Sequence, residues 1–334
     1  MDLHLLYIIL IIVIALTFDF TNGAHDAANS IATIVSTKVL SLRQALFFAA
    51  FFNFISFLVF GNEVAKTIGK GLVNINIVTP EVVLMGLIAA IVWNLITLYL
   101  ALPTSSSHAL IGGYAGAAIA AAGWSAIIAS GWIKIFLFIV LAPLLGFALG
   151  YLFIILLTWA IYLLKMTPGA VNYWSRHLQL LSAGLYSLAH GSNDAQKTIG
   201  IITGLLVSAG YLSTFDVPLW VVLSAHTCIA LGTLYGGKRI IKTMGHKIFK
   251  LRPVDGVASE SASATSIFLA TFLGVPVSTT HVITGAISGV GSAQRFKAVK
   301  WGTTIRIVWA WIFTIPGAGG MAFLLYSIGA FFLT

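Results

Sequence analysis

The motif Asn-Gly-Ala-His-Asp-Ala-Ala-Asn at residues 22–29 returns 168 residues later as His-Gly-Ser-Asn-Asp-Ala-Gln-Lys at residues 190–197. A second motif behaves in the same way, because Pro-Thr-Ser-Ser-Ser-His at 103–108 returns 173 residues later as Pro-Val-Ser-Thr-Thr-His at 276–281. Small and hydroxylated residues also recur at helix contacts in membranes, which is the alternative explanation. Two kinds of motif that return in the same order and at nearly the same separation instead indicate that the chain contains two copies of one structural unit.

The composition excludes an ordinary soluble protein. Hydrophobic residues make up 59% of the 334-residue chain and charged residues only 8%, whereas an average soluble domain is roughly 25% charged. Apolar runs such as those at 3–18, 82–101 and 132–164 are long enough to cross the ~30 Å hydrocarbon core of a lipid bilayer. These runs are continuous and not alternating, so the sequence predicts an all-α polytopic membrane protein.

Each copy is expected to contain five apolar segments. Because five is odd, the second copy enters the membrane from the opposite side, which predicts two inverted-topology repeats at 1–165 and 178–334 with a cytoplasmic linker at 166–177. The segments at 103–122 and 276–291 are short and rich in glycine. Full spans and re-entrant hairpins both remain open for them, and hairpins would give each repeat about six elements. The other segments are expected at 3–37, 42–61, 82–101, 131–164, 178–208, 217–236, 256–275 and 303–332.

The net charge of +9 indicates membrane orientation and not a nucleic-acid partner. Cytoplasmic loops of membrane proteins collect Lys and Arg, and six basic residues lie between 238 and 252. With this stretch in the cytoplasm, the segment count places thirteen basic side chains inside and three, Lys66, Lys70 and Lys134, outside. The prediction is a multi-pass protein of the cell's inner (plasma) membrane with both termini outside the cytoplasm.

The first motif pair predicts a cation site. Inverted repeats with interrupted helices are typical of secondary transporters, which bind substrate between the repeats near the membrane midplane. An ionised carboxylate at that depth costs roughly 2.5–3.5 kcal/mol, and the neighbouring glycine is expected to unwind the helix and free backbone carbonyls. Such oxygens suit Na⁺, although a solvated packing motif near the membrane surface is the alternative. The predicted Na⁺ ligands are Asn22, Asp26, Asn29, Asn193 and Asp194.

The second motif pair predicts an anion site. A proline breaks one segment and is expected in the first turn of the next, where hydroxyl groups join the free N–H groups of a helix N-terminus that attract anions. Two such helix ends, brought together, would enclose a tetrahedral oxyanion; close helix packing is the alternative. The predicted ligands are Thr104, Ser105, Ser106, Ser107, Gln196, Ser278, Thr279 and Thr280.

Four other polar residues keep more than one interpretation. Lys197 either donates to the bound anion or neutralises Asp194, and it is also a candidate gate residue. Glu260 is either an additional cation ligand or gate, or a solvated glutamate that the helix macrodipole favours near a helix start. His108 and His281 are related by the repeat and are expected to make structural hydrogen bonds.

The pair Ser107 and His108 also raises the hypothesis of an intramembrane hydrolase. Adjacent residues of a helix point about 100° apart, which is poor geometry for a nucleophile and its base, and a hydrolase does not need each polar group twice. The single cysteine, Cys228, excludes an intramolecular disulfide or a paired-thiol site. No catalytic residue and no enzymatic activity are predicted.

Both motif pairs resemble the signatures of the inorganic phosphate transporter (PiT) family. Residues 22–29 resemble its first signature, residues 190–200 resemble the second in the form common among prokaryotic members, and the two hydroxyl motifs resemble those that follow. His25 departs from the pattern, because many members have asparagine there. The resemblance implies transport of inorganic phosphate with Na⁺ or H⁺; a few members carry sulfate, and some form dimers, so a homodimer is one expectation.

The motifs and the resemblance together predict a secondary active transporter that imports inorganic phosphate by Na⁺ symport through alternating access. A proton-coupled phosphate symporter and a sulfate symporter on the same fold are the alternatives, and an anion channel is a more distant one. Sulfate carries no proton at neutral pH, whereas phosphate can donate one to a carboxylate. Asp26 and Asp194 therefore favour phosphate.

Overall fold

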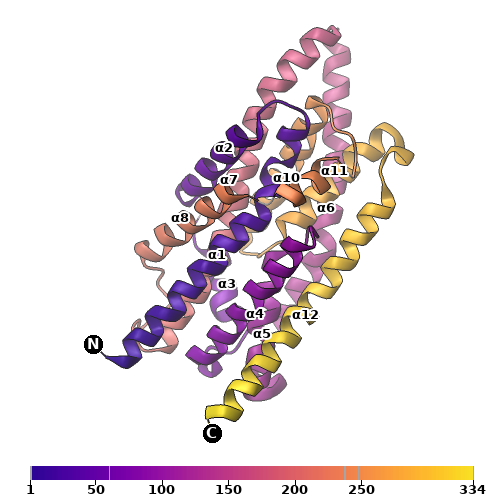
Figure 1. The fold of residues 1–334 in the computed structure, drawn as a ribbon. Helices are drawn as coiled ribbons and strands as arrows, with labels where there is room; N and C mark the ends of the chain where they lie inside the picture. Colours follow the sequence, from indigo (N-terminus) through magenta and orange to yellow (C-terminus); the bar gives the residue numbers. More distant parts are fainter. Residues whose placement is uncertain (1, 60, 237, 247, 334) are drawn as a thin grey trace.

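The computed structural model describes residues 2–59, 61–236, 238–246 and 248–333, and within them the chain is almost entirely helical (Figure 1). The helices of the first half are α1 (Leu3–Ser36), α2 (Leu42–Ile55), α3 (Glu63–Gly71), α4 (Pro80–Tyr99), α5 (Ser106–Ala122) and α6 (Ala129–Leu163). Those of the second half are α7 (Pro168–Ser208), α8 (Leu219–Tyr235), α9 (Lys238–His246), α10 (Pro253–Phe272), α11 (Thr279–Arg295) and α12 (Trp301–Leu333).

Several helices confirm the predicted all-α membrane protein. By length and composition α1, α4, α6, α12 and α5 with its extension to Ala126 can each cross a membrane, and α2 with α3 would form a further span bent by 82°. Large apolar side chains such as Phe136 and Leu144 of α6 and Ile312 of α12 are exposed. Lipid tails are the environment in which such an outer surface is stable, because the helices satisfy their own backbone hydrogen bonds.

Helices of the two halves pack against each other in a reciprocal way. α5 packs against α12 and α11 packs against α6, while α1 contacts α8 and α7 contacts α2. The short helices follow the same rule, since α3 lies on α7 and α9 lies on α1. The contacts that α1 to α6 make with the second half are thus mirrored by those that α7 to α12 make with the first.

Two helical hairpins bring the second motif pair to the centre of the molecule. The first hairpin, α4 and α5, lies near the end that carries both termini, and the second hairpin, α10 and α11, lies near the opposite end (Figure 1). Their tips, residues 100–105 and 273–278, are buried from Pro103 and from Gly274 onward. The hairpins meet at the centre, because the Thr280 hydroxyl donates a 3.0 Å hydrogen bond to the carbonyl oxygen of Thr104.

The predicted interruption of the first-motif helices is wrong, because α1 and α7 are continuous through both motifs. The motif glycines allow close contact between helices and do not unwind them. A Cβ atom on Gly23 would lie 2.2 Å from the carbonyl oxygen of Ile229 in α8, and one on Gly191 would lie 2.5 Å from the Ser56 hydroxyl oxygen. The polar side chains of both motifs therefore project from intact helices, and no carbonyls are freed by unwinding in these described turns.

The expected position of the motif prolines is also wrong. α5 and α11 begin at Ser106 and Thr279, three residues after the prolines, which lie in the extended tips. Ser105 and Ser278 are the N-caps, and their hydroxyls accept hydrogen bonds of 3.2 and 3.3 Å from the backbone N–H groups three residues further on. Serine caps a helix start well because its oxygen satisfies an N–H group that has no helical partner.

Segments that carry basic residues lie at the end of the molecule opposite the termini. Arg176 donates a 2.8 Å hydrogen bond to the carbonyl oxygen of Lys38 there, and α9 packs against the last turns of α1, where Gly245 approaches Ala32. Lys247 of the basic stretch lies outside the described residues. Because α7 begins at Pro168, the expected linker at 166–177 is helical after its first two residues.

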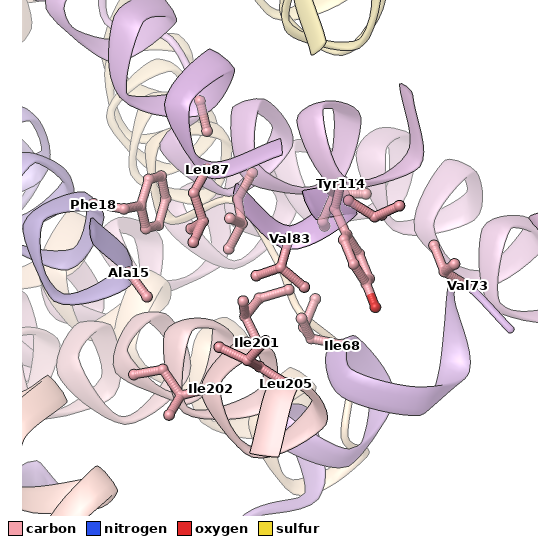
Figure 2. Close-up of a cluster of buried hydrophobic side chains, with 14 of the residues drawn as sticks. Ala15, Phe18, Ile68, Val73, Val83, Leu87, Tyr114, Ile201, Ile202 and Leu205 are labelled. Carbon is pink, nitrogen blue, oxygen red and sulfur yellow. The ribbon is translucent and has the colours of Figure 1, made fainter. Parts of the chain in front are cut away.

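An apolar cluster fills the space between the centre and the end that carries the termini. Figure 2 shows side chains from α1, α3, α4, α5 and α7 meeting there, among them Phe18, Ile68, Leu87, Tyr114 and Ile202. All of these side chains are buried. The cluster therefore closes the centre of the molecule toward that end.

Candidate substrate and ion site

Helices α1 and α7 bring the two copies of the first motif into one buried site. One ligand atom from each of Asp26, His190 and Asp194 lies within 4.8 Å of the others. All three residues have exposed fractions of 2% or less. The two carboxylates are therefore not solvated at a membrane surface, and they belong to a single centre between the halves.

Lys197 neutralises the carboxylate of the second repeat. Its ammonium nitrogen lies 2.5 Å from Oδ1 of Asp194, and Nε2 of His190 lies 3.3 Å from the other carboxylate oxygen. The same ammonium donates to the hydroxyl of Ser107 and, at 2.8 Å, to the carbonyl oxygen of Val277. Lys197 thus links α7 to the first turn of α5 and to the tip of the second hairpin.

Asp26 is surrounded differently. Its Oδ1 lies 2.8 Å from Nδ1 of His25 and accepts a 3.4 Å hydrogen bond from the Ser106 hydroxyl. Asn29, one turn further along α1, donates a 2.8 Å hydrogen bond to the Thr280 hydroxyl and a 3.5 Å one to Thr279. Among the described residues, no lysine or arginine pairs with Asp26. The position in the first motif that corresponds to Lys197 is occupied by the uncharged Asn29.

The hydroxyl side chains at 105–107 and 278–280, called the hydroxyl rows below, have two roles. Ser105 and Ser278 cap their helices, as described above, so their oxygens are already used by backbone N–H groups. Ser106 and Ser107 of α5 face Asp26 and Lys197. Together with Thr279 and Thr280 of α11, they place hydroxyls and helix N-termini from both halves beside the two carboxylates, which is an arrangement that suits an anion next to a cation.

Comparisons with known proteins identify the family of this chain. Residues 22–322 match the phosphate transporter family. A Rhizobium meliloti (strain 1021) protein named "Probable low-affinity inorganic phosphate transporter" is 53% identical over 329 residues, or 98% of each chain. The chain belongs to the phosphate transporter family. A Bacillus subtilis (strain 168) protein of the same name is 46% identical over 331 residues, again 98% of each chain.

The fold of this phosphate transporter family member also matches a solved structure. That structure is described as "The sodium-dependent phosphate transporter", and it aligns with a TM-score of 0.86 and 26% sequence identity over 97% of this chain and 99% of that chain. The predicted family is confirmed, as is the prediction of a transporter and not an enzyme. The chain is a multi-pass membrane protein.

The histidines of the hydroxyl motifs pack against each other in this family member. The rings of His108 and His281 meet edge to face with centroids 4.7 Å apart, and His281 stacks on Trp311 at 3.7 Å. The Ser107 hydroxyl contacts Lys197 and not a histidine. Ser107 and His108 therefore do not form the nucleophile and base of a hydrolase.

Two predicted ligands, Gln196 for the anion and Asn193 for Na⁺, form hydrogen bonds that hold neighbouring helices and loops in place. Gln196 accepts hydrogen bonds of 3.0 and 3.3 Å from the backbone N–H groups of Val64 and Ala65, so it satisfies the start of α3. The structure does not bring its side chain to the hydroxyl rows. The amide of Asn193 bonds the second hairpin at Thr271 and at the backbone of the tip.

Glu260 of α10 belongs to a separate cluster of buried polar side chains. It is fully buried and accepts hydrogen bonds from Gln179 (2.9 Å) and Ser182 (2.5 Å) of α7. Thr37 of α1 donates to Gln179 from the other side, at 2.9 Å. Because Glu260 is buried, its interpretation as a solvated glutamate near a helix start is wrong.

Sequence reasoning missed Asp19. This residue is fully buried in α1, two turns before Asp26 and on the same side of the helix. Its neighbours Asn22 and Thr198 are also buried. The sequence does contain a signal for this residue. Asp19 directly follows the apolar run at 3–18, and a carboxylate inside the membrane there is as costly as Asp26.

Proposed function

We propose that this protein imports inorganic phosphate together with Na⁺ by alternating access. The observation that carries the proposal is the buried centre in which Asp26, Asp194 and His190 lie between two rows of hydroxyls. Relatives named as inorganic phosphate transporters and a structural neighbour named as sodium-dependent support it. A cation at the carboxylates and an anion at the hydroxyls would stabilise each other in this site.

Na⁺ would bind beside Asp26, because that carboxylate lacks the ammonium group that Lys197 gives to Asp194. Carboxylate and amide oxygens are suitable ligands for a hard cation. Asn22 and Asn29 lie on the same helix as Asp26, and Asp194 closes the site from α7. In this proposal a Na⁺ ion does for the first repeat what Lys197 does for the second.

Phosphate would bind between the starts of α5 and α11. Donors there are the hydroxyls of Ser106, Ser107, Thr279 and Thr280, the N–H groups of two helix N-termini, and the ammonium of Lys197. Thr104, Ser105 and Ser278 would hold the tips in position, as their hydrogen bonds indicate. Phosphate is favoured over sulfate because a protonated phosphate oxygen can donate to Asp26 or Asp194.

Alternating access would come from movement of one inverted repeat relative to the other. The domains proposed are repeats at 1–165 and 178–334 with residues 166–177 between them on the cytoplasmic side. Both termini would then face outward from the inner membrane, which agrees with the basic groups gathered at the other end. A homodimer remains an expectation of the family resemblance.

The membrane potential would help to drive uptake. Each net positive charge that moves inward gains roughly 2.3 kcal/mol per 100 mV, so one surplus Na⁺ supports accumulation of phosphate. Glu260, buried with Gln179 and Ser182, would bind a cation on the route toward the cytoplasm or act as a gate there.

Uptake of radiolabelled phosphate into proteoliposomes tests the proposal. Na⁺ and H⁺ gradients are imposed separately, and sulfate is added as competitor. Uptake that needs the Na⁺ gradient and resists excess sulfate supports phosphate symport with Na⁺. Uptake driven by the H⁺ gradient alone, inhibition by sulfate, or flux without either gradient would replace it with the proton-coupled, sulfate or channel alternative.

A further inference from the structure

The interface between α1 and α7 carries polar residues at three levels. At the centre Asp26 meets His190 and Asp194, as described above. Toward the end opposite the termini, Thr37 of α1 bonds Gln179 of α7. Toward the termini, Asp19 of α1 neighbours Thr198 of α7. We call this outer level the Asp19 site, defined by Asp19, Asn22 and Thr198.

The oxygens of the Asp19 site are buried and unpartnered. Asp19 and Thr198 have no exposed surface, and Asn22 has an exposed fraction of 1%. Among the described residues, neither carboxylate oxygen of Asp19 has a hydrogen-bond partner of good geometry, and the same holds for Oδ1 of Asn22 and the hydroxyl of Thr198. Thr198 and Asn22 are neutral polar neighbours of the Asp19 carboxylate, and no hydrogen bond of good geometry joins the three side chains.

Asp19 differs in this respect from the other buried carboxylates. Asp26 contacts His25, Asp194 contacts Lys197, and Glu260 accepts from two side chains of α7. The charge of Lys197 also acts on Asp19, but its ammonium is already bound to Asp194, Ser107 and Val277. An isolated buried carboxylate is costly unless a positive group binds it, so the Asp19 site lacks a partner.

We propose that the Asp19 site binds a Na⁺ ion. Carboxylate, amide and hydroxyl oxygens are the ligand types of a hard cation, and one ion would satisfy all of them at once. A single proton binds one oxygen, whereas a cation can contact several of these oxygens at the same time. Mg²⁺ fits less well, because it demands near-ideal octahedral geometry and gives up its water reluctantly.

The place of the site suggests a role in the proposed function, on which this part of the inference rests. Asp19 precedes Asp26 by seven residues, so it lies about 10 Å nearer the termini along α1. The apolar cluster in Figure 2, which includes Phe18 and Ile202, lies between it and that end. A Na⁺ ion entering past this cluster would reach Asp19 before Asp26.

The second half of the chain has no equivalent of the Asp19 carboxylate. The residue that corresponds to Asp19 in the second half is Ser187, and the one that corresponds to Thr198 is Ser30. Both serines are buried with unpartnered hydroxyls, but no carboxylate accompanies them at those two positions. The second half therefore has no second copy of the Asp19 site, and Ser187→Ala is a matched control for a change at Asp19.

Equilibrium binding of ²²Na⁺ to the purified full-length protein, without phosphate, tests the proposal. Asp19→Asn is expected to remove one bound Na⁺ per chain, and Thr198→Val to weaken that component at least tenfold, while Ser187→Ala binds like the wild type. Elution as a single size-exclusion peak verifies that each variant is folded. Thr198→Val keeps the carboxylate and serves if Asp19→Asn does not fold.

The outcomes separate this site from the proposed function. Loss of one Na⁺ in Asp19→Asn supports the site, even if phosphate uptake by the wild type proves independent of Na⁺. Unchanged Na⁺ binding in Asp19→Asn overturns the site, although Na⁺-dependent uptake by the wild type would leave the proposed function standing. A wild type that binds no Na⁺ either without or with phosphate overturns both.

Discussion

His25 and Asn193 occupy equivalent positions in the two repeats, and each one fixes the tip of a hairpin. Nε2 of His25 lies 3.2 Å from the Thr97 hydroxyl and 3.3 Å from that of Thr104, at the end of the first hairpin. The Asn193 amide donates to Thr271 at 2.9 Å and also bonds the backbone of the second tip. Each motif helix is thereby coupled to the hydroxyl row of its own repeat.

This equivalence predicts that His25→Asn retains most phosphate uptake, because asparagine performs the same task at position 193. His25→Leu and Asn193→Leu leave buried hydroxyls and carbonyls of the tips without partners, at a cost of about 1–3 kcal/mol each, and uptake should fall strongly. Initial rates in proteoliposomes at several phosphate concentrations measure the effect. Equal loss in His25→Asn and His25→Leu would contradict the positioning role.

Asp194→Asn is predicted to abolish Na⁺-dependent phosphate uptake. The variant removes one of the two central carboxylates and leaves the ammonium of Lys197 with only the neutral partners Ser107 and Val277. Expression and membrane insertion should remain, which immunoblots of the membrane fraction would measure. Asp216→Asn, a change at an exposed residue, is the matched control, and undiminished uptake by Asp194→Asn would refute the assignment of this carboxylate.

Ser107→Ala is predicted to raise the KM for phosphate about tenfold or more, since a hydrogen bond to a charged group contributes about 1.5–3 kcal/mol. Its hydroxyl contacts Lys197 in the first turn of α5, where the anion is proposed to bind. Ser125→Ala, at an exposed position after the same helix, should leave the KM unchanged. A lower maximal rate with unchanged KM would instead indicate a role in the movement between states.

Glu260→Gln is predicted to raise the Na⁺ concentration needed for half-maximal uptake, with little change in the KM for phosphate at saturating Na⁺. The substitution keeps the size of the side chain but removes the charge that a cation beside Gln179 and Ser182 would need. Glu63→Gln, which breaks only an exposed pair with Lys66, provides the control. If both variants show the wild-type Na⁺ dependence, Glu260 is not a cation ligand.

The residues that can be read from the sequence are those whose chemistry is unusual in a membrane. Asp26, Asp194 and the two hydroxyl rows stand out against 59% hydrophobic residues, and the duplication shows which of them correspond. Their pairings depend on how separate helices approach each other, so the contacts of Gln196 with α3 and of Lys197 with α5 cannot be derived from spacing. Asp19 was not predicted as a site residue, because it has no acidic counterpart in the second repeat.

The glycines of the first motif could not be interpreted correctly without the packing. Gly23 next to a buried carboxylate suggests an unwound helix, but the same residue also permits the backbone of α8 to come close. Local sequence does not distinguish these two uses of glycine. The distinction lies in Ile229, which is distant in the chain and close in space.

Gly23→Ala separates the two uses by experiment. The added methyl group would lie 2.2 Å from the carbonyl oxygen of Ile229, a contact that the two helix backbones can relieve only by moving apart, and overpacking of this kind costs about 1–3 kcal/mol. The melting temperature of the purified protein should therefore fall. Gly320→Ala, where no atom lies within 4 Å of the new Cβ, should keep or raise it, because alanine is the better helix former. If Gly23→Ala kept its melting temperature and lost only uptake, the glycine would serve a transient unwinding of α1 during transport and not the close contact with α8.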